Sequence, residues 1–439
     1  MRRAERIITW ILPIIAFGIF LSYAMLSPRA NTAAIVSAGA GILLFTAAGL
    51  RMIRSMLGFF VVPMYNRHDE LIGERTKYHM HPRRRIFFRS LVMQVVAVFV
   101  VYLIFCAVNG YSGTVFQKYS TIFMQQNVYG IGLLAHNAAS EIALLPVVSK
   151  LVTFVNMTDS IDAGVLNLIA FILNALIVSF GCVMFYEVLL LDNDRDVSSK
   201  ALLTLFISPA ILFLLMPLSG ASLLFLLSLL FFYFMKTSRP LIGLFFMVEA
   251  IAFNILALVL LIPFVLLCIK LIVKNGKNKK LRILSITALS LGVIGGGGLI
   301  ALIGCGVINS HAVSLMYPDG FRWYFEGMTA AIQRWNASTS SALAMFYAIG
   351  AQVAALLLAV LCAHRVDFSI GMFTLGWMAL VPMAFKDPSM AVYAVCVCPS
   401  VPIMLSASAK RRTTRLILWA LMLVVFVTFT ATVFAYRLA

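Results

Sequence analysis

The sequence predicts an all-α polytopic membrane protein with about thirteen transmembrane helices. Of its 439 residues, 62% are hydrophobic and only 11% are charged, and the mean hydropathy is +1.00. Soluble globular domains carry about 25% charged residues. The apolar runs are long and continuous, close to the roughly 20 residues that a helix needs to cross a bilayer, whereas strands of a membrane barrel alternate over about ten. No room is left for a sizeable water-soluble domain.

Charged clusters separate the apolar windows and so define the expected spans. In chain order they are 7–27, 32–50, 91–108, 165–191, 201–216, 221–235, 240–252, 254–273, 283–308, 341–363, 368–385, 389–408 and 416–436. The first span follows Arg2, Arg3 and Arg6 and is longer than the core of a signal peptide, so we expect it to be retained. The basic segment 51–90 comes after the second span, and we expect it to lie against anionic lipid headgroups.

The middle of the chain is divided by prolines. Pro209, Pro217 and Pro240 split 201–252 into short segments, because proline interrupts a helix. The stretch 240–273 is either one long tilted helix or a hairpin that turns near Glu249. Gly295–Gly298 falls within a span and lacks the Lys-Ser/Thr of a phosphate loop, which favours close helix packing.

The net charge of +18 is explained by membrane topology. With a cytoplasmic N-terminus and an extracytoplasmic C-terminus, 27 of the 34 Lys and Arg residues fall on the inner side. The other seven are Arg29, Lys118, Lys150, Arg322, Arg334, Lys386 and Arg437. This asymmetry favours that orientation of an integral multi-pass membrane protein, and we expect the membrane to be a bacterial cell membrane. Basic residues are not interleaved with aromatics in a polar context, so we expect no nucleic-acid partner.

Two long extracytoplasmic loops, 109–164 and 309–340, are expected to roof a cavity at the outer face. The first contains an apolar stretch from Ile131 to Val155 with scattered polar residues, which is typical of interfacial or re-entrant helices. The second concentrates aromatic residues between Tyr317 and Glu326, at the depth of the headgroups.

Several of these segments resemble a known family. They are Glu141–Val152 with its Leu-Pro step, Leu203–Leu230 with Ser208-Pro209 and Pro217-Leu-Ser, Asp319–Trp335, and Ser389–Tyr393 followed by Cys398-Pro399. In this order they resemble the phosphatidylinositol-glycan class V type mannosyltransferases, which have the GT-C fold. The resemblance divides the chain into two additional N-terminal spans with a basic loop (1–90), a GT-C-like core (91–410) and a C-terminal span (411–439).

The resemblance implies transfer of a mannose-type sugar from a polyprenyl-phosphate donor to a lipid or cell-envelope acceptor. However, the family's polar functional positions are occupied here by Tyr119-Ser120, Gly220, Asn254 and Val392. The family's catalytic Asp, in particular, has no counterpart. The chain is therefore either a divergent enzyme or a relative that has lost catalysis.

Sugar transfer needs a carboxylate to take the acceptor's proton and cations to hold the departing phosphate. Glu141 is the first candidate base, because an ionisable group in an apolar membrane-level stretch is costly unless it is paired or useful. Asp159 and Asp162 are further candidates, or charges that stabilise a helix N-terminus. For phosphate and sugar binding the candidates are Lys118, His136, Lys150, Arg322, Trp323, Arg334 and Trp335. The alternative role of the long cations and aromatics is anchoring at the membrane interface.

Two other functions remain open at this stage. A catalytically inactive GT-C relative would act as a binding or assembly subunit for another membrane protein. A lipid or glycan transporter would rely on charged residues within its spans, for which Glu187 and Glu249 are the candidates. No metal site is predicted, because Asp192–Asp196 lacks the Gly and the bidentate Glu of a calcium loop.

Overall fold

The structure, a computed structural model, describes a bundle of helices. The described residues are 82–109, 163–192, 195–215, 220–253, 255–274, 278–305, 366–384 and 412–436, together with Gly350, Cys398, Ser400, Val401 and Ile403. All regular structure among them is helical, as predicted. Four of the described helical stretches are long and apolar enough to cross a membrane: Arg85–Val108, Phe171–Leu190, Leu256–Lys274 and Lys279–Leu302.

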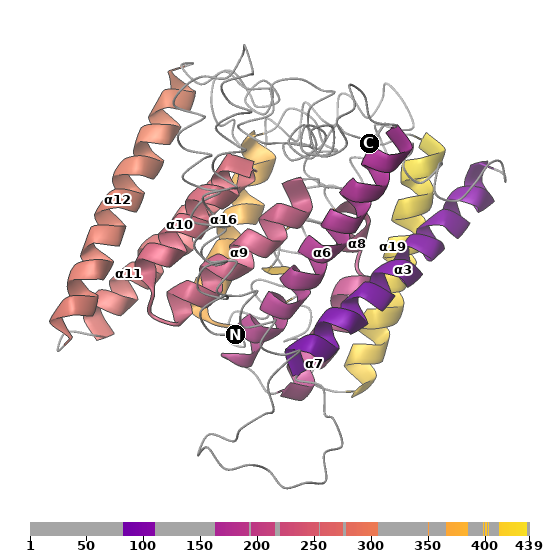
Figure 1. The fold of residues 1–439 in the computed structure, drawn as a ribbon, viewed down its shortest axis with the longest axis horizontal. Coiled ribbons are helices and arrows are strands. Elements are labelled where there is room, and N and C mark those ends of the chain that lie inside the picture. Colours follow the sequence, from indigo (N-terminus) through magenta and orange to yellow (C-terminus); the bar gives the residue numbers. More distant parts are fainter. Residues whose placement is uncertain are drawn as a thin grey trace, which may run out of the picture.

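The described helices follow the expected spans that fall within the described residues (Figure 1), whereas the expected spans 7–27, 32–50, 341–363 and 389–408 lie almost entirely outside them. They are α3 (Pro82–Asn109), α6 (Ala163–Leu190), α7 (Arg195–Ile207), α8 (Ala210–Leu214), α9 (Gly220–Lys236), α10 (Pro240–Phe253), the 3₁₀ helix η3 (Ile255–Leu260), α11 (Leu261–Lys274), α12 (Lys279–Gly304), α16 (Phe368–Ala384) and α19 (Arg412–Tyr436). The largest difference is in α3, which begins at Pro82, well before residue 91. Pro is favoured in the first turn of a helix because its missing N–H needs no partner there. Arg83, Arg85 and Arg89 therefore belong to a helix and not to the predicted loop 51–90.

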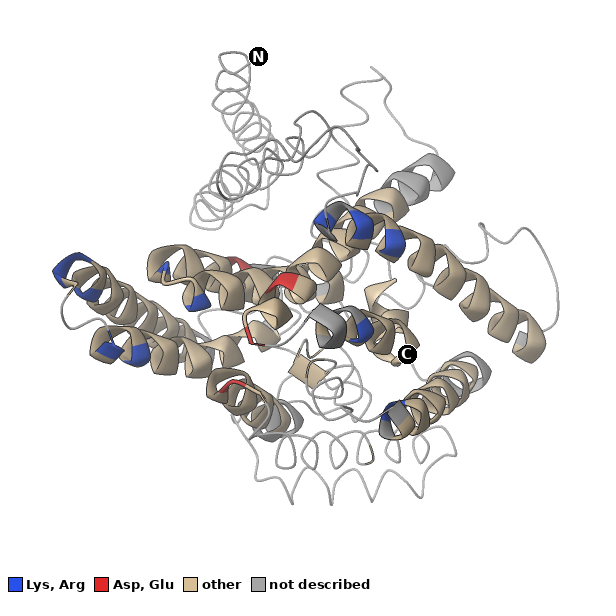
Figure 2. Cartoon of the chain, turned by 90° about the horizontal axis from the view of Figure 1, so that it is seen from below, with Lys and Arg blue, Asp and Glu red and all other residues tan. Residues whose placement is uncertain are grey.

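The ends of the described helices gather at two ends of the bundle (Figure 1). One end contains the beginnings of α3, α7, α10, α12, α16 and α19 and the final turns of α6, α9 and α11. We call it the basic end, because the Lys and Arg residues of the described helices cluster there (Figure 2). They are Arg83, Arg85, Arg89, Lys200, Lys236, Arg239, Lys270, Lys274, Lys279, Lys280, Arg282 and Arg415. Each of these residues was predicted to lie on the inner side.

Helix α9 forms the centre of the described bundle. Every residue from Ala221 to Phe232 is buried. Its aromatic rings contact three neighbours: Phe225 lies 6.1 Å from Phe185 of α6, Phe231 lies 6.4 Å from Phe264 of α11, and Phe232 lies 5.5 Å from Phe373 of α16, between ring centroids. Burial on all sides is typical of a helix that is apolar all round and lies in the core of a bundle.

Polar side chains in the apolar interior are used to tie helices together. The Gln94 amide donates to the Ser179 hydroxyl at 2.8 Å and joins α3 to α6. The Asn174 amide donates to the backbone carbonyl of Leu214 at 2.9 Å, and the Trp419 indole donates to the Thr204 hydroxyl at 3.0 Å. Such bonds are favoured because an unsatisfied polar group in an apolar medium is costly.

The breaks at Pro209 and Pro240 occur where the sequence predicts them, and Pro217 lies outside the described residues. Helix α7 ends at Ile207, Ser208 and Pro209 form a bend, and α8 begins at Ala210. Pro240 begins α10 after a tight turn in which Ser238 has a φ of 62°. Of the two alternatives for 240–273, the structure has the hairpin, because α10 ends at Phe253 and η3 begins at Ile255. The break lies one turn beyond Glu249.

Close packing of α12 involves only part of its glycine run. A β-carbon at Gly296 would lie 2.7 Å from the Leu261 side chain, whereas Gly295, Gly297 and Gly298 face open space. One turn earlier, a β-carbon at Gly292 would lie 2.3 Å from the Phe264 ring. The face with Gly292 and Gly296 is therefore the one that lets α12 approach α11.

Candidate functional site

The residues predicted to carry out sugar transfer lie outside the described residues. These are Glu141, Asp159 and Asp162 as candidate acids and bases, and Lys118, His136, Lys150, Arg322, Trp323, Arg334 and Trp335 as candidate substrate contacts. What the structure does place is the set of helix ends that flank the two long loops. Asn109 at the end of α3, Ala163 at the start of α6 and Gly304 at the end of α12 all lie at the end of the bundle opposite the basic end (Figure 1).

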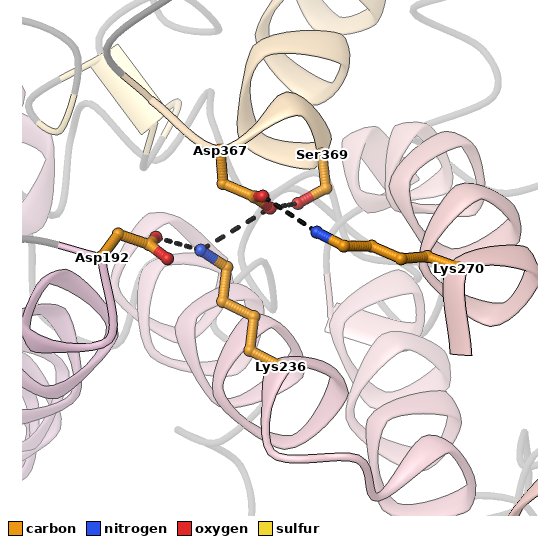
Figure 3. Close-up of polar contacts among 5 residues, drawn as sticks. All are labelled: Asp192, Lys236, Lys270, Asp367 and Ser369. Atoms are coloured by element: carbon orange, nitrogen blue, oxygen red, sulfur yellow. Dashed lines mark hydrogen bonds and ion pairs between the residues drawn. The ribbon is translucent and has the colours of Figure 1, made fainter. Parts of the chain in front are cut away.

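At the basic end, an ion-pair cluster joins four parts of the bundle (Figure 3). Lys236, the last residue of α9, forms ion pairs with Asp192 after α6 and with Asp367 before α16. Its ammonium nitrogen lies 3.7 Å from Oδ2 of Asp367. Lys270 of α11 reaches the same carboxylate from the other side, with Nζ 3.2 Å from Oδ1. The cluster is thus a chain of ion pairs in the order Asp192, Lys236, Asp367 and Lys270. It connects the ends of α6, α9 and α16 with α11.

The local structure explains why these side chains meet. Asp367 precedes α16, where a negative charge is stabilised by the partial positive charge of the helix N-terminus. Its backbone carbonyl accepts from the N–H groups of Ile370 and Gly371 at 3.0 and 3.1 Å, and its carboxylate accepts from the Ser369 hydroxyl. Lys236 lies at the C-terminus of α9, where the partial negative charge of the helix end stabilises a cation.

The two lysines of this cluster differ in burial. The side chain of Lys236 is 8% exposed, whereas that of Lys270 is 61% exposed. Burial alone raises the pKa of Asp367, but the Ser369 hydrogen bond and the charges of Lys236 and Lys270 act more strongly in the other direction, so its pKa lies below the usual range. Asp367 is therefore a carboxylate at neutral pH, and its ion pairs hold the helix ends together; we call this cluster the Lys236 clamp.

A second ion pair joins α3 to α6. Arg83 Nε donates to Oε1 of Glu187 at 2.6 Å, and Arg83 Nη2 donates to Oε2 at 2.8 Å. A guanidinium and a carboxylate in this two-point geometry form one of the strongest hydrogen-bonded ion pairs in proteins. Glu187, predicted as a charged residue within a span, has a structural partner.

Glu249 of α10 is in a different situation. It is only 7% exposed. Within the described part of the chain, no cation and no hydrogen-bond donor contacts its carboxyl group.

No group of three or more His, Cys, Asp or Glu residues that could hold a metal is found among the described residues, and none was predicted there. Asp192, the first residue of the segment that resembles part of a calcium loop, is paired with Lys236. The described residues thus offer two charge clamps and one isolated buried acid.

Sequence reasoning missed the clamp around Lys236. It treated the charges near the span ends only as indicators of topology, and their partners are distant in the chain. The sequence did contain an indication of these ion pairs. Asp192 and Asp367 are acids in inner segments that are otherwise rich in cations, and such an acid is expected to pair with a nearby cation.

Comparison with known proteins gives no relative: no family model, no curated protein and no solved structure matches this chain.

Proposed function

We propose that this chain is a membrane glycosyltransferase of GT-C type in a bacterial cell membrane. It transfers a mannose-type sugar from a polyprenyl-phosphate donor to a lipid or cell-envelope acceptor. The N-terminus and the basic end face the cytoplasm, and the C-terminus and the two long loops are extracytoplasmic. The active site is formed by the residues of segments 109–164 and 309–340.

The observation that carries the proposal is the position of the helix ends flanking those segments. The chain leaves α3 at Asn109 and enters α6 at Ala163 at the same end of the bundle, and it leaves α12 at Gly304 at that end too (Figure 1). Both segments therefore connect to the end opposite the cations, which under the positive-inside rule is the outer face. A polyprenyl-phosphate donor presents its sugar at a membrane face, so donor and loops would meet there.

The packing of the core gives further support. The longest segment that resembles the GT-C family, Leu203–Leu230, contributes to α7, α8 and α9. These include the most completely buried part of the described bundle, from Ala221 to Phe232. This one resembling segment therefore includes buried residues at the centre of the described bundle, and the other three segments, apart from Cys398, lie outside the described residues.

In the proposed reaction, the hydroxyl oxygen of the acceptor attacks the anomeric carbon of the sugar, and the bond from that carbon to the phosphate oxygen breaks. Glu141 takes the hydroxyl proton. The polyprenyl phosphate leaves with the bonding electron pair, and Arg322 and Arg334 stabilise its charge by two-point contacts. Lys118, His136 and Lys150 add positive charge, and Trp323 and Trp335 stack on the sugar.

The test is transfer of radiolabelled mannose from its polyprenyl-phosphate conjugate to extracted envelope lipids by the purified protein in liposomes. We expect Glu141→Gln to lower the rate by about 100-fold or more, as for removal of a general base. Glu70→Gln is the matched control, because it makes the same change in the inner segment 51–90 and should leave the rate unchanged. Equal rates for wild type and Glu141→Gln would exclude Glu141 as the base. Absence of transfer by the wild type would favour the assembly-subunit alternative.

A further inference from the structure

We infer that Glu249 is a proton-binding site in the interior of the helix bundle, with its carboxyl group in the protonated form. This site is separate from the predicted sugar-transfer residues, and the inference holds whichever reaction the outer loops perform. It rests on the burial of Glu249, on the absence of a partner for it among the described residues and on a comparison with Glu187.

Glu249 faces the packed side of α10. Its neighbours on that helix, Phe246, Met247, Ala250 and Ile251, are buried apolar residues, whereas Val248 is 51% exposed. Glu249 therefore lies on the buried side of α10, among apolar side chains.

The basic end is too far away to supply a cation. Glu249 follows Pro240, the first residue of α10, by nine positions, which is about 13 Å at 1.5 Å per residue. Helix α10 packs against α9, η3, α11 and α12. Their described titratable and charged residues are Tyr233 and Lys236 on α9, Cys268, Lys270 and Lys274 on α11, and Lys279, Lys280 and Arg282 on α12; η3 has none. In the described part of the chain, none of these residues pairs with Glu249.

Glu187 shows how this protein pairs a carboxylate in an apolar helix. Both of its oxygens accept hydrogen bonds from Arg83, at 2.6 and 2.8 Å. Glu249 has the same side chain and lies in a similarly apolar helix, but no described residue pairs with it in this way. The two glutamates therefore have different states: Glu187 is a paired carboxylate, and Glu249 is a neutral acid.

The chemistry of an apolar medium requires this difference. An unpaired carboxylate there loses its hydration without compensation, and binding a proton removes the charge. The neutral acid also has an O–H donor, which the carboxylate lacks. Helix α10 is interrupted between Phe253 and Ile255, one turn beyond Glu249, and backbone carbonyls near a helix C-terminus lack intrahelical partners. The protonated acid can donate to such an oxygen.

A hydrophobic carbodiimide tests the inference on the wild-type protein in its membrane. The reagent, dicyclohexylcarbodiimide, adds to a protonated carboxyl group: the acid's proton goes to a carbodiimide nitrogen, its oxygen bonds to the central carbon, and rearrangement gives an N-acylurea with no leaving group. We expect peptide mass spectrometry at neutral pH to find the adduct on Glu249 in at least ten-fold excess over Glu187. Equal modification of both residues, or no adduct on Glu249, would overturn the inference.

Two variants sharpen this test. In Glu249→Gln the neutral amide replaces the neutral acid, so we expect the adduct to disappear while the thermal midpoint in detergent changes by less than the spread of replicates. A large drop in that midpoint would show that the carboxylate form is needed, against the inference. In Arg83→Gln, Glu187 loses its cation, and we expect it to become reactive toward the carbodiimide. Continued protection of Glu187 in that variant would show that pairing does not control reactivity, which would remove the basis of the comparison.

Discussion

Arg83 and Glu187 are 104 positions apart in the chain, yet they form a two-point ion pair with N–O distances of 2.6 and 2.8 Å. The Arg83 side chain is 33% exposed and that of Glu187 is 15% exposed. The pair fixes the first turn of α3 against the last two turns of α6, close to the basic end of the bundle.

Replacing Arg83 with Gln should destabilise the protein, because Glu187 then loses both charged hydrogen bonds in a partly buried position. We expect a loss of about 1–3 kcal/mol, seen as a lower midpoint in a thermal denaturation assay in detergent. Arg85→Gln is the control, since Arg85 is exposed on the same helix, and its effect should stay below about 0.5 kcal/mol. The double variant Arg83→Gln/Glu187→Gln should recover part of the lost stability, because it no longer contains an unpaired carboxylate. A double variant less stable than Arg83→Gln alone would contradict this account of the pair.

The cluster around Lys236 predicts unequal effects for two lysines. Lys236→Met leaves Asp192 with no cation and removes one of the two cations of Asp367, in a site where the lysine side chain is 8% exposed. We expect this variant to lose about 1–3 kcal/mol of stability. Lys270→Met removes a side chain that is 61% exposed, and the expected loss is below about 1 kcal/mol. Similar thermal midpoints for the two variants would argue against a clamp centred on Lys236.

The stability of the protein should depend on the ionisation of Asp367. Its pKa in the folded protein lies below the usual value of about 3.9, so the carboxylate contributes stability above that value, and this contribution is lost as the pH falls through the folded pKa. Thermal midpoints between pH 6 and pH 3 should therefore fall more steeply for the wild type than for Asp367→Asn. Parallel curves would show that Asp367 is not preferentially ionised in the folded state.

The contact between α11 and α12 predicts a difference between two glycines of the same helix. In Gly292→Ala the new methyl group would lie 2.3 Å from the Phe264 ring, so the ring or the helix must shift, at a cost of about 1–3 kcal/mol. In Gly297→Ala the methyl group meets open space, and the higher helix propensity of alanine should stabilise by up to about 1 kcal/mol. Urea or thermal unfolding of the two variants measures the difference. A stabilised Gly292→Ala would contradict the observed approach of the helices.

The sequence predicts the positions of the helices well, because the determinants are local. Pro209 and Pro240 lack an N–H and so disfavour a continuous helix through their positions, and the apolar windows between charged clusters have the length of a span. The start of α3 at Pro82 was missed because its first turns are basic, and a search for apolar windows does not include a helix that extends beyond the apolar region.

The pairing of charges could not be predicted in the same way. Glu187 was noticed as an acid within a span, but its partner depends on how α3 packs on α6, which no local pattern encodes. The same holds for Lys236 and Asp367. The proposed sugar-transfer residues, including Glu141, lie outside the described residues, so for them only the position of the flanking helix ends is established.

The central claim is that sugar transfer takes place at the end of the bundle opposite the basic end. The most direct measurement uses sealed membrane vesicles of both orientations, supplied with a short-chain, water-soluble polyprenyl-phosphate mannose that does not cross the bilayer. We predict that product forms only in right-side-out vesicles, where the segments 109–164 and 309–340 face the added donor. Product in inside-out vesicles alone, or in neither orientation, would contradict the account.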